Sequence, residues 1–348
     1  MEDFYHIADK LCSDHSLSIE EYESLIKNYS PEAAEYLRKE ALALRKKYYG
    51  NSVYIRGLIE FTNICKNDCL YCGIRKSNLK CQRYRLSPEE ILDSCNQGYE
   101  LGFRTFVLQG GEDTYFTDDI LSSIIMSIKE KHNDCAVTLS IGERSLESYR
   151  ALHRAGADRY LLRHETADPL HYAKLHPSFM SFTNRMECLK NLREAAFVTG
   201  AGFMVGSPFQ TPRELAQDLK FIEDFKPQMC GIGPFIPHSD TPFADYKAGS
   251  AELTCYLLSI IRIIKPDILL PSTTALSTLS PNGRLNGILS GANVIMPNLS
   301  PLSVRKKYSL YNKKACTGSE SAQELDLIKK DFAAAGYEIV VDRGDPVS

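Results

Sequence analysis

Short apolar runs alternate along this chain with longer stretches in which apolar residues recur at helical spacing. The runs are rich in β-branched and aromatic residues and are bounded by turn-forming residues, which indicates buried strands. The predicted strands are Tyr54–Phe61, Thr105–Gln109, Ala136–Ile141, Arg159–Arg163, Gly202–Val205, Met229–Ile232, Ile268–Leu270 and Asn293–Met296.

The stretches between these runs contain helix-start signals. Ser87 precedes Pro88-Glu89-Glu90, and Thr211 precedes Pro212-Arg213-Glu214, as expected of an N-cap followed by proline and an acidic residue. The predicted helices are Pro88–Leu101, Asp118–Lys131, Leu146–Ala155, Asn184–Phe197, Pro212–Phe225, Glu252–Ile264 and Gly283–Leu289.

Eight strands joined by helices predict an α/β fold of the (βα)8 TIM-barrel type, which takes about 250 residues. A doubly wound sheet is the alternative, and it is disfavoured because no glycine-rich dinucleotide fingerprint follows the first strand. We expect an N-terminal helical extension at residues 1–50, the barrel at 51–300 and a C-terminal cap at 301–348. The predicted cap contains a helix near Ala322–Ala335 and a short strand at Glu338–Val341.

The loop after the first predicted strand contains Cys65, Cys69 and Cys72, with the spacing C-x3-C-x2-C. A structural zinc site or an electron-transfer cluster normally takes four protein ligands, and no Cys or His follows here at a matching short spacing. Three ligands on a 4Fe–4S cluster leave one iron open for S-adenosylmethionine (SAM). The spacing, with aromatic Tyr71 before the last cysteine, resembles the radical SAM superfamily motif. A zinc knuckle and scattered core cysteines are the alternative interpretations.

Composition restricts the possible partners. The 348 residues have a net charge of −3, which gives no nucleic-acid footprint. The 11 cysteines suggest no disulfide framework, the N-terminus shows no signal peptide, and no apolar run is long enough to span a bilayer. These features predict a cytoplasmic protein with neither a membrane nor a nucleic-acid partner.

Polar side chains gather where the predicted strands end, which in such barrels is the active-site face. Thr138 and Ser140 share one face of their strand, as do Arg159 and Arg163. An arginine inside a barrel is costly unless an anion pairs with it. We therefore expect a substrate carboxylate at Arg159, Arg163 and Arg56.

Several segments together resemble the HydE family of iron–iron hydrogenase maturases. The resemblance covers roughly residues 45–312. It rests on Glu60–Asn63, Val107–Asp113, Arg159–Thr166, Gly231–His238, Ser272–Ala275 and Gly291–Asn298.

The resemblance implies that a reduced 4Fe–4S cluster at the three cysteines cleaves SAM, giving a 5′-deoxyadenosyl radical. That radical would attack the sulfur of a cysteine-bound iron species with carbonyl and cyanide ligands. The implied cofactor contacts are Ser140, Glu165, Arg185 and Met204, with Tyr71 beside the cluster. The implied substrate contacts are Arg56, Gln109, Thr138, Arg159, Arg163, Thr273, Thr274, Tyr308 and Tyr311.

The resemblance also implies transient contacts with other hydrogenase maturases and with an electron donor. Some family members have a second cluster on three C-terminal cysteines, whereas this region has only Cys316, so a single cluster is predicted. Methylornithine synthase and biotin synthase share the expected barrel and remain alternatives, as does a non-catalytic iron–sulfur carrier.

Overall fold

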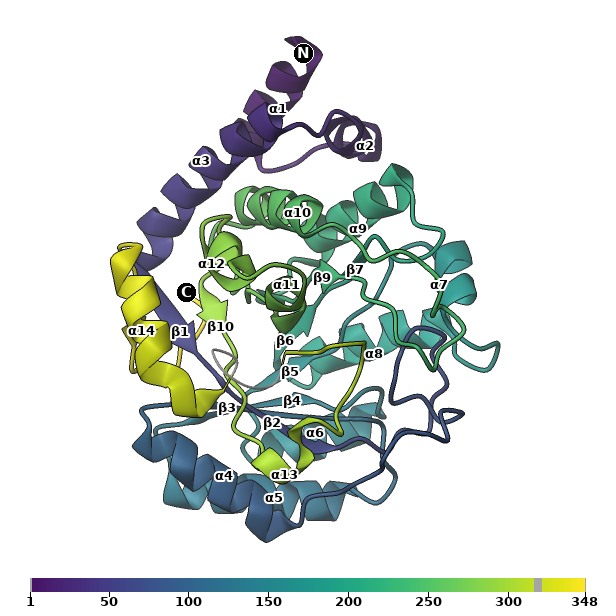
Figure 1. The fold of residues 1–348 in the computed structure, drawn as a ribbon, viewed down its shortest axis with the longest axis vertical. Coiled ribbons are helices and arrows are strands. Elements are labelled where there is room, and N and C mark those ends of the chain that lie inside the picture. Colours follow the sequence, from purple (N-terminus) through teal and green to yellow (C-terminus); the bar gives the residue numbers. More distant parts are fainter. Residues whose placement is uncertain (1, 316–320, 348) are drawn as a thin grey trace.

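The computed structural model describes residues 2–315 and 321–347. Its centre is a six-stranded parallel sheet in the order β2-β3-β4-β5-β6-β8, enclosed by helices (Figure 1). The strands are β2 Gly57–Thr62, β3 Thr105–Gly110, β4 Ala136–Ser140, β5 Arg159–Leu161, β6 Val198–Ala201 and β8 Met229–Cys230.

Two smaller sheets complete the strand set. One has the order β10-β1-β11, and the other pairs β7 with β9. These strands are β1 Ser52–Ile55, β7 Met204–Val205, β9 Gly233–Pro234, β10 Val294–Ile295 and β11 Glu338–Val340.

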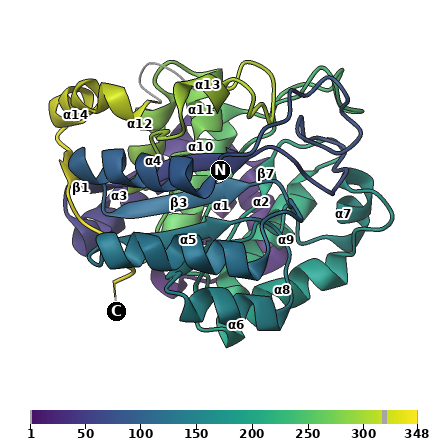
Figure 2. The same cartoon turned by 90° about the horizontal axis from the view of Figure 1, so that it is seen from below.

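Helices cover the outer faces of the strands, and Figure 2 shows α4 and α5 on either side of β3. The barrel helices are α4 Pro88–Glu100, α5 Asp118–Lys131, α6 Leu146–Arg154, α7 Pro169–Leu175, α8 Phe182–Glu194, α9 Pro212–Phe225, α10 Ala251–Ile264, α11 Thr274–Leu279 and α12 Gly283–Ile288. The C-terminal helices are α13 Leu302–Arg305, the 3-10 turn η2 Ala322–Glu324 and α14 Leu325–Ala334.

The N-terminal extension consists of α1 Glu2–Asp14, α2 Ile19–Lys27 and α3 Pro31–Tyr49. Buried polar contacts fix it to the barrel. Glu223 of α9 accepts hydrogen bonds from Tyr22 Oη at 2.7 Å and Ser16 Oγ at 2.7 Å, and Tyr256 Oη of α10 donates to the Leu25 carbonyl at 2.9 Å. The apolar core is continuous from α1 to α14. The three-part division of the chain stays a prediction.

The predicted parallel strands and outer helices are confirmed, but the strand ladder is not continuous. The expected strand Tyr54–Phe61 is divided into β1 and β2 at Arg56. Ile268–Leu270 is not a strand, because Asn293 Oδ1 takes the place of a backbone acceptor for the Leu270 N–H at 2.9 Å. Single bridges, Met229 to Leu269 and Pro271 to Val294, connect the chain around this side.

The fifth predicted strand, Gly202–Val205, also differs from the prediction. Helix α8 ends at Glu194 and not at Phe197, because Ala196 adopts a left-handed φ of 65° that breaks the helix. The chain then forms β6, and the expected strand Gly202–Val205 is reduced to β7. Three helices or turns were not predicted by the periodicity: α7, α11 and α13.

The C-terminal tail closes the end of the barrel at which the strands begin. Strand β11 pairs in parallel with β1, and the chain then passes Arg159, the first residue of β5. Arg159 Nη2 lies 2.6 Å from Asp345 Oδ1 and donates to the Arg343 carbonyl at 2.8 Å. Thr105 Oγ1, at the start of β3, donates to the same carbonyl at 2.7 Å. The tail is therefore part of the barrel floor.

We predict that Asp345→Asn destabilises the fold by about 1–3 kcal/mol, because it leaves buried Arg159 without a charged partner. The expected loss is smaller than for a fully buried ion pair because Asp345 itself is half exposed. Burial acts to raise the pKa of Asp345, but hydrogen bonds from Arg343 and Arg159 outweigh it and the pKa is lowered. This contribution is present above the unfolded-state pKa of about 3.9 and is lost as the pH falls through the folded-state pKa. Chemical denaturation at neutral pH measures the effect, with exposed Asp331→Asn of α14 as control. Equal stability of the two variants would contradict the role of the tail.

Candidate functional site

The cysteine loop follows β2 and is held by a dense set of hydrogen bonds. Asp68 accepts two bonds from Arg75, at 2.7 and 2.6 Å, and one from Ser77 Oγ at 2.8 Å. The guanidinium of Arg83 donates to four backbone carbonyls of the loop region, those of residues 63, 74, 75 and 78. These bonds fix the loop backbone. The sequence analysis did not identify Arg83, and only its position shortly after the triad could have suggested it.

The next residue after the triad must be glycine for steric reasons. A Cβ on Gly73 would lie 2.2 Å from the Ser309 carbonyl oxygen and 2.3 Å from the ring of His238. The Gly73 N–H donates to the Leu310 carbonyl at 2.8 Å. His238 Nδ1 accepts from Asp240 N at 3.1 Å, so this histidine takes part in the local loop structure. The loop is thus packed closely under the C-terminal segment.

The three thiols of the triad lie near one another and are largely shielded from water. Burial raises the pKa of Cys72 to about 12 and raises the pKa of Cys69 well above its usual range. The charge of Cys65 adds to both shifts, and that of Cys72 adds to the shift of Cys69. Cys65 Sγ also accepts from the Glu112 N–H at 3.4 Å. Thiolates crowded in this way need a cationic group, and the irons of a cluster would supply it. The donor set therefore fits a cubane cluster with three protein ligands.

Most of the expected cofactor contacts lie beside the triad. Arg185 and Glu165 both act on the pKa of Cys69 and on that of Tyr71, which places them close to the loop. Tyr71 and Met204 belong to one apolar cluster, with Leu175, Phe235 and Phe243. Ser140 ends β4 opposite Gln109 of β3. The structure thus brings residues from five different segments to one end of the barrel.

Arg185 is oriented by Glu143, which the sequence analysis did not assign to the site, and by the backbone of Arg163, which it did. Its Nε donates to Glu143 Oε1 at 2.6 Å and its Nη1 to the Arg163 carbonyl at 2.6 Å. Glu143 also accepts from Asn184 Nδ2 at 2.6 Å. His176, stacked on Tyr172 and 3.2 Å from Tyr71 Oη, has a pKa lowered to about 3, chiefly by burial. This histidine is neutral and packs behind Tyr71.

The inner face of the barrel is lined by polar residues that alternate with core residues. Val137 and Leu139 of β4 pack in the apolar core, so Thr138 and Ser140 face the opposite side, as predicted. By the same alternation Gln109 faces inward, and its Nε2 donates to Tyr308 Oη at 3.4 Å. Tyr308 is 2% exposed. Thr138, Gln109 and Tyr308 therefore lie on one inner side of the barrel, and their role as substrate contacts stays a prediction.

Several inward polar atoms have no hydrogen-bond partner among the described residues: Arg56 Nε and Nη2, Thr138 Oγ1, Arg163 Nε and Nη2, and Thr273 Oγ1. Arg56 is 4% exposed, and the one hydrogen bond that its side chain makes among the described residues runs from Nη1 to Met229 Sδ at 3.2 Å. Arg163 Nη2 lies 2.9 Å from Glu165 Oε2, an ion pair without hydrogen-bond geometry. Buried polar atoms in native proteins are rarely left unpaired, so these atoms indicate a place for a polar ligand.

The remaining expected substrate contacts lie at the edge of this set. Thr274 is the first residue of α11, preceded by Thr273 as N-cap without a side-chain capping bond. Tyr311 is partly buried in the C-terminal segment. Lys314 of that segment lies 2.5 Å from Glu60 Oε1, and Asn298 Nδ2 donates to Glu60 Oε2 at 2.9 Å. This buried ion pair, which the sequence analysis missed, fixes the segment over the barrel.

Arg159 lies near one expected substrate contact, Arg56, and far from another, Arg163. Burial lowers the pKa of Arg56, and the charge of Arg159 adds to that shift. Arg159 begins β5 and lies at the floor of the barrel, whereas Arg163 lies beyond the other end of that strand. The structure corrects the argument that a substrate anion must neutralise Arg159, because Asp345 pairs with its Nη2. Its Nε has no hydrogen-bond partner among the described residues. Strand β5 ends at Leu161, so the two arginines do not share one continuous strand face.

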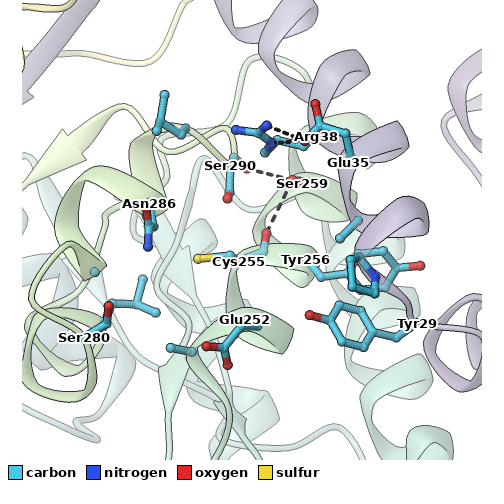
Figure 3. A pocket seen from close by; sticks show the side chains of 16 residues that line it. Tyr29, Glu35, Arg38, Glu252, Cys255, Tyr256, Ser259, Ser280, Asn286 and Ser290 are labelled. Carbon is cyan, nitrogen blue, oxygen red and sulfur yellow. Dashed lines mark hydrogen bonds and ion pairs between the residues drawn. The ribbon is translucent and has the colours of Figure 1, made fainter. Parts of the chain in front are cut away.

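A surface pocket of about 230 Å³ lies elsewhere, between α3 and α10 (Figure 3). Ser259 Oγ there donates to the Ser290 carbonyl at 3.1 Å, and Arg38 is paired with Glu35 on the α3 side. None of the expected cofactor or substrate contacts lines this pocket. We therefore place the candidate site at the cysteine loop and the inner face of the barrel.

A parallel barrel with three cysteines after its first inner strand defines the radical SAM class, and residues 59–222 match the radical SAM superfamily. Two solved structures share the fold. Methylornithine synthase has a TM-score of 0.85 at 23% identity over 96% of this chain and 97% of that one. The [FeFe]-hydrogenase maturase HydG has a TM-score of 0.79 at 22% identity over 97% and 75%.

In sequence, the chain is 48% identical to the [FeFe] hydrogenase maturase subunit HydE of Thermotoga maritima over 302 residues, which is 87% of this chain and 86% of that protein. It is 27% identical to 3-methylornithine synthase of Methanosarcina acetivorans over 84% and 83% of the two chains. The chain belongs to the HydE family. It is a radical SAM enzyme, and the predicted cofactors of this family, a 4Fe–4S cluster and SAM, are confirmed. No helix in the described part of the chain could span a membrane.

We predict that anaerobic reconstitution loads one 4Fe–4S cluster, about four irons per chain, and that Cys72→Ala abolishes loading because three thiolates are the minimum for this cluster type. Cys81→Ser is the matched control, since Cys81 is a half-exposed cysteine of the same loop region. Cys316 lies outside the described residues, so Cys316→Ser is measured in parallel. About eight irons per chain would contradict a single cluster, and iron and sulfide analysis decides between the two.

Proposed function

We propose that this enzyme acts in the maturation of [FeFe] hydrogenase, on a small substrate in which cysteine is bound to iron with carbonyl and cyanide ligands. The cluster, when reduced by a one-electron donor, supplies the electron that cleaves SAM into methionine and a 5′-deoxyadenosyl radical. The substrate sulfur is the proposed point of attack by this radical. Identity of 48% to the HydE subunit of Thermotoga maritima supports this role.

The unpaired polar atoms on the inner face support an anionic, polar substrate. Arg56 presents two buried nitrogen atoms without a partner among the described residues, and a planar guanidinium binds a carboxylate through paired hydrogen bonds. The hydroxyl groups of Thr138 and Thr273 could donate to cyanide nitrogen or to a carboxylate. Gln109 and Tyr308 close the same side. Arg159 is left out of this set because Asp345 pairs with it.

The proposed SAM contacts lie between this inner face and the triad. Arg185, held by Glu143, would pair with the SAM carboxylate. Glu165 would accept hydrogen bonds from the ribose hydroxyls or the amino group. Tyr71 and Met204 provide apolar surface beside them, with Ser140 at the strand end. Closing such a site excludes water, which protects a reactive radical.

Other partners follow from the reaction. A substrate that already contains iron, carbonyl and cyanide must be made by another maturase, and its product must be passed on. The electron donor must reach the cluster loop. We therefore propose transient contacts with other hydrogenase maturases and with a small electron carrier.

We predict that Glu165→Ala weakens SAM binding while the cluster is retained. The loss of one charge-assisted hydrogen bond costs about 1.5–3 kcal/mol, or roughly ten- to a hundredfold in affinity. Titration of the reconstituted protein with SAM gives the dissociation constant, and iron content gives the cluster control. Unchanged affinity would remove Glu165 from the proposed SAM site.

The function is tested most directly by Arg56→Met. An unpaired buried guanidinium is unfavourable for folding, so its replacement by an apolar side chain of similar length should leave stability unchanged or raise it. The same change should abolish maturation of apo-hydrogenase in the presence of the other maturases, because the substrate carboxylate loses its partner. SAM cleavage without substrate should persist.

Arg45→Met is the matched control. Arg45 is also buried, but its three nitrogen atoms donate to the carbonyls of Ala292, Gly50 and Ser52 at 2.7–2.9 Å. This variant should lose stability. Full maturation by Arg56→Met would show that Arg56 does not bind the substrate, and failure of an otherwise active enzyme to support maturation at all would reject the proposed function.

A further inference from the structure

Glu165 has an unusual backbone conformation for a residue at a functional site. Its φ of 67° lies in the left-handed region, which is unfavourable for a non-glycine residue and persists only where the surroundings enforce it. The flanking backbone bonds are those of Glu165 N to the Gly202 carbonyl at 3.0 Å and of Met204 N to the Glu165 carbonyl at 3.3 Å. These two bonds fix Glu165 itself, and the residues on either side of it need their own anchors.

Those anchors converge on one carboxyl group of α9. Asp218 Oδ1 lies 3.2 Å from His164 Nε2 and accepts the Ala167 N–H at 2.6 Å. Residues 164 and 167 stand immediately before and shortly after Glu165. Both His164 and Asp218 are 0% exposed. A single buried oxygen therefore holds both sides of the Glu165 turn.

The protonation of His164 follows from its partners. Gly202 N–H donates to His164 Nδ1 at 3.3 Å, so Nδ1 is unprotonated. The proton of the neutral ring is then on Nε2 and points to Asp218 Oδ1. The ring also packs between Phe221 of α9, at 4.5 Å between ring centroids, and Phe203, at 5.8 Å. His164 is consequently fixed in position and in tautomer.

We propose that Asp218, acting through His164 and Ala167, is a positioning residue that holds Glu165 in the conformation needed for SAM binding. Asp218 lies on α9 behind the turn and is fully buried there, so it acts through the turn and does not itself bind SAM. The same turn presents the Arg163 carbonyl that accepts from Arg185. This inference rests on the proposed role of Glu165 and names the residues that make that role possible.

The test compares two substitutions of Asp218 in the full, cluster-loaded chain. Asp218→Ala removes the shared oxygen, and we expect the dissociation constant for SAM to rise about tenfold, a size typical of coupled neighbouring residues. Asp218→Asn keeps Oδ1 as an acceptor for both bonds, so SAM affinity should stay close to that of the unsubstituted protein. Iron content and thermal unfolding are measured for each variant.

Ile222→Ala is the matched control for damage to α9. Ile222 is buried on the same helix and belongs to the apolar core, and its apolar side chain cannot hydrogen-bond to the Glu165 turn. We expect this variant to lose thermal stability while SAM affinity is unchanged. If Asp218→Ala does not fold, His164→Phe replaces it, because phenylalanine keeps the packing against Phe203 and Phe221 but loses both polar contacts.

A double-mutant cycle with Glu165→Ala decides the mechanism. The effect of Asp218→Ala on SAM affinity should be much smaller in the Glu165→Ala background, since Arg185 is then the one proposed SAM contact that the turn still positions. Two outcomes would overturn the inference and leave the proposed function intact. One is an equal effect of Asp218→Ala in both backgrounds. The other is no effect of Asp218→Ala on SAM binding although Glu165→Ala alone weakens it. No effect of Glu165→Ala alone would reject the proposed SAM contact and the inference with it.

Discussion

Guanidinium groups buried on the inner face of the barrel impose the main physical constraint on this structure. Each costs free energy unless an anion or a set of carbonyl oxygens surrounds it. Arg159 at the floor forms an ion pair with Asp345, and Arg163 at the opposite end forms one with Glu165. Arg56 has only a sulfur contact among the described residues. The arrangement of the site follows from which cations the chain neutralises itself and which it leaves for a ligand.

The sequence allowed the barrel class, the cysteine triad and most helices to be predicted, because these depend on local signals. The periodic patterns gave Asp118–Lys131 and Pro212–Phe225 with the observed bounds of α5 and α9. The strands were harder. The Leu270 N–H bonds to a side-chain oxygen of Asn293 in place of a backbone carbonyl of a neighbouring strand. No local sequence pattern predicts such a bond. Local propensity also could not foresee that Ala196 would end α8 early.

Within the site, the residue types were predictable but their partners were not. The expectation that buried arginines need anions was sound physics, yet for Arg159 the anion is Asp345, remote in sequence and in an apparently ordinary polar tail. The same reason explains why the roles of Asp218 and Glu143 were not predicted. Each is a common carboxylate on or near a helix, and its importance arises only when the fold places it against His164 or Arg185.

The C-terminal segment takes part in closing both ends of the barrel, although it contributes little to the main sheet. Near its start, Lys314 reaches the buried carboxylate of Glu60 and Leu310 binds the backbone of the cysteine loop. Near its end, Asp345 reaches Arg159. Both closures use an opposite charge against a group that the barrel has buried, so each stabilises the segment and the barrel interior together. The radical site therefore depends for its enclosure on residues beyond the strands and helices that define its class.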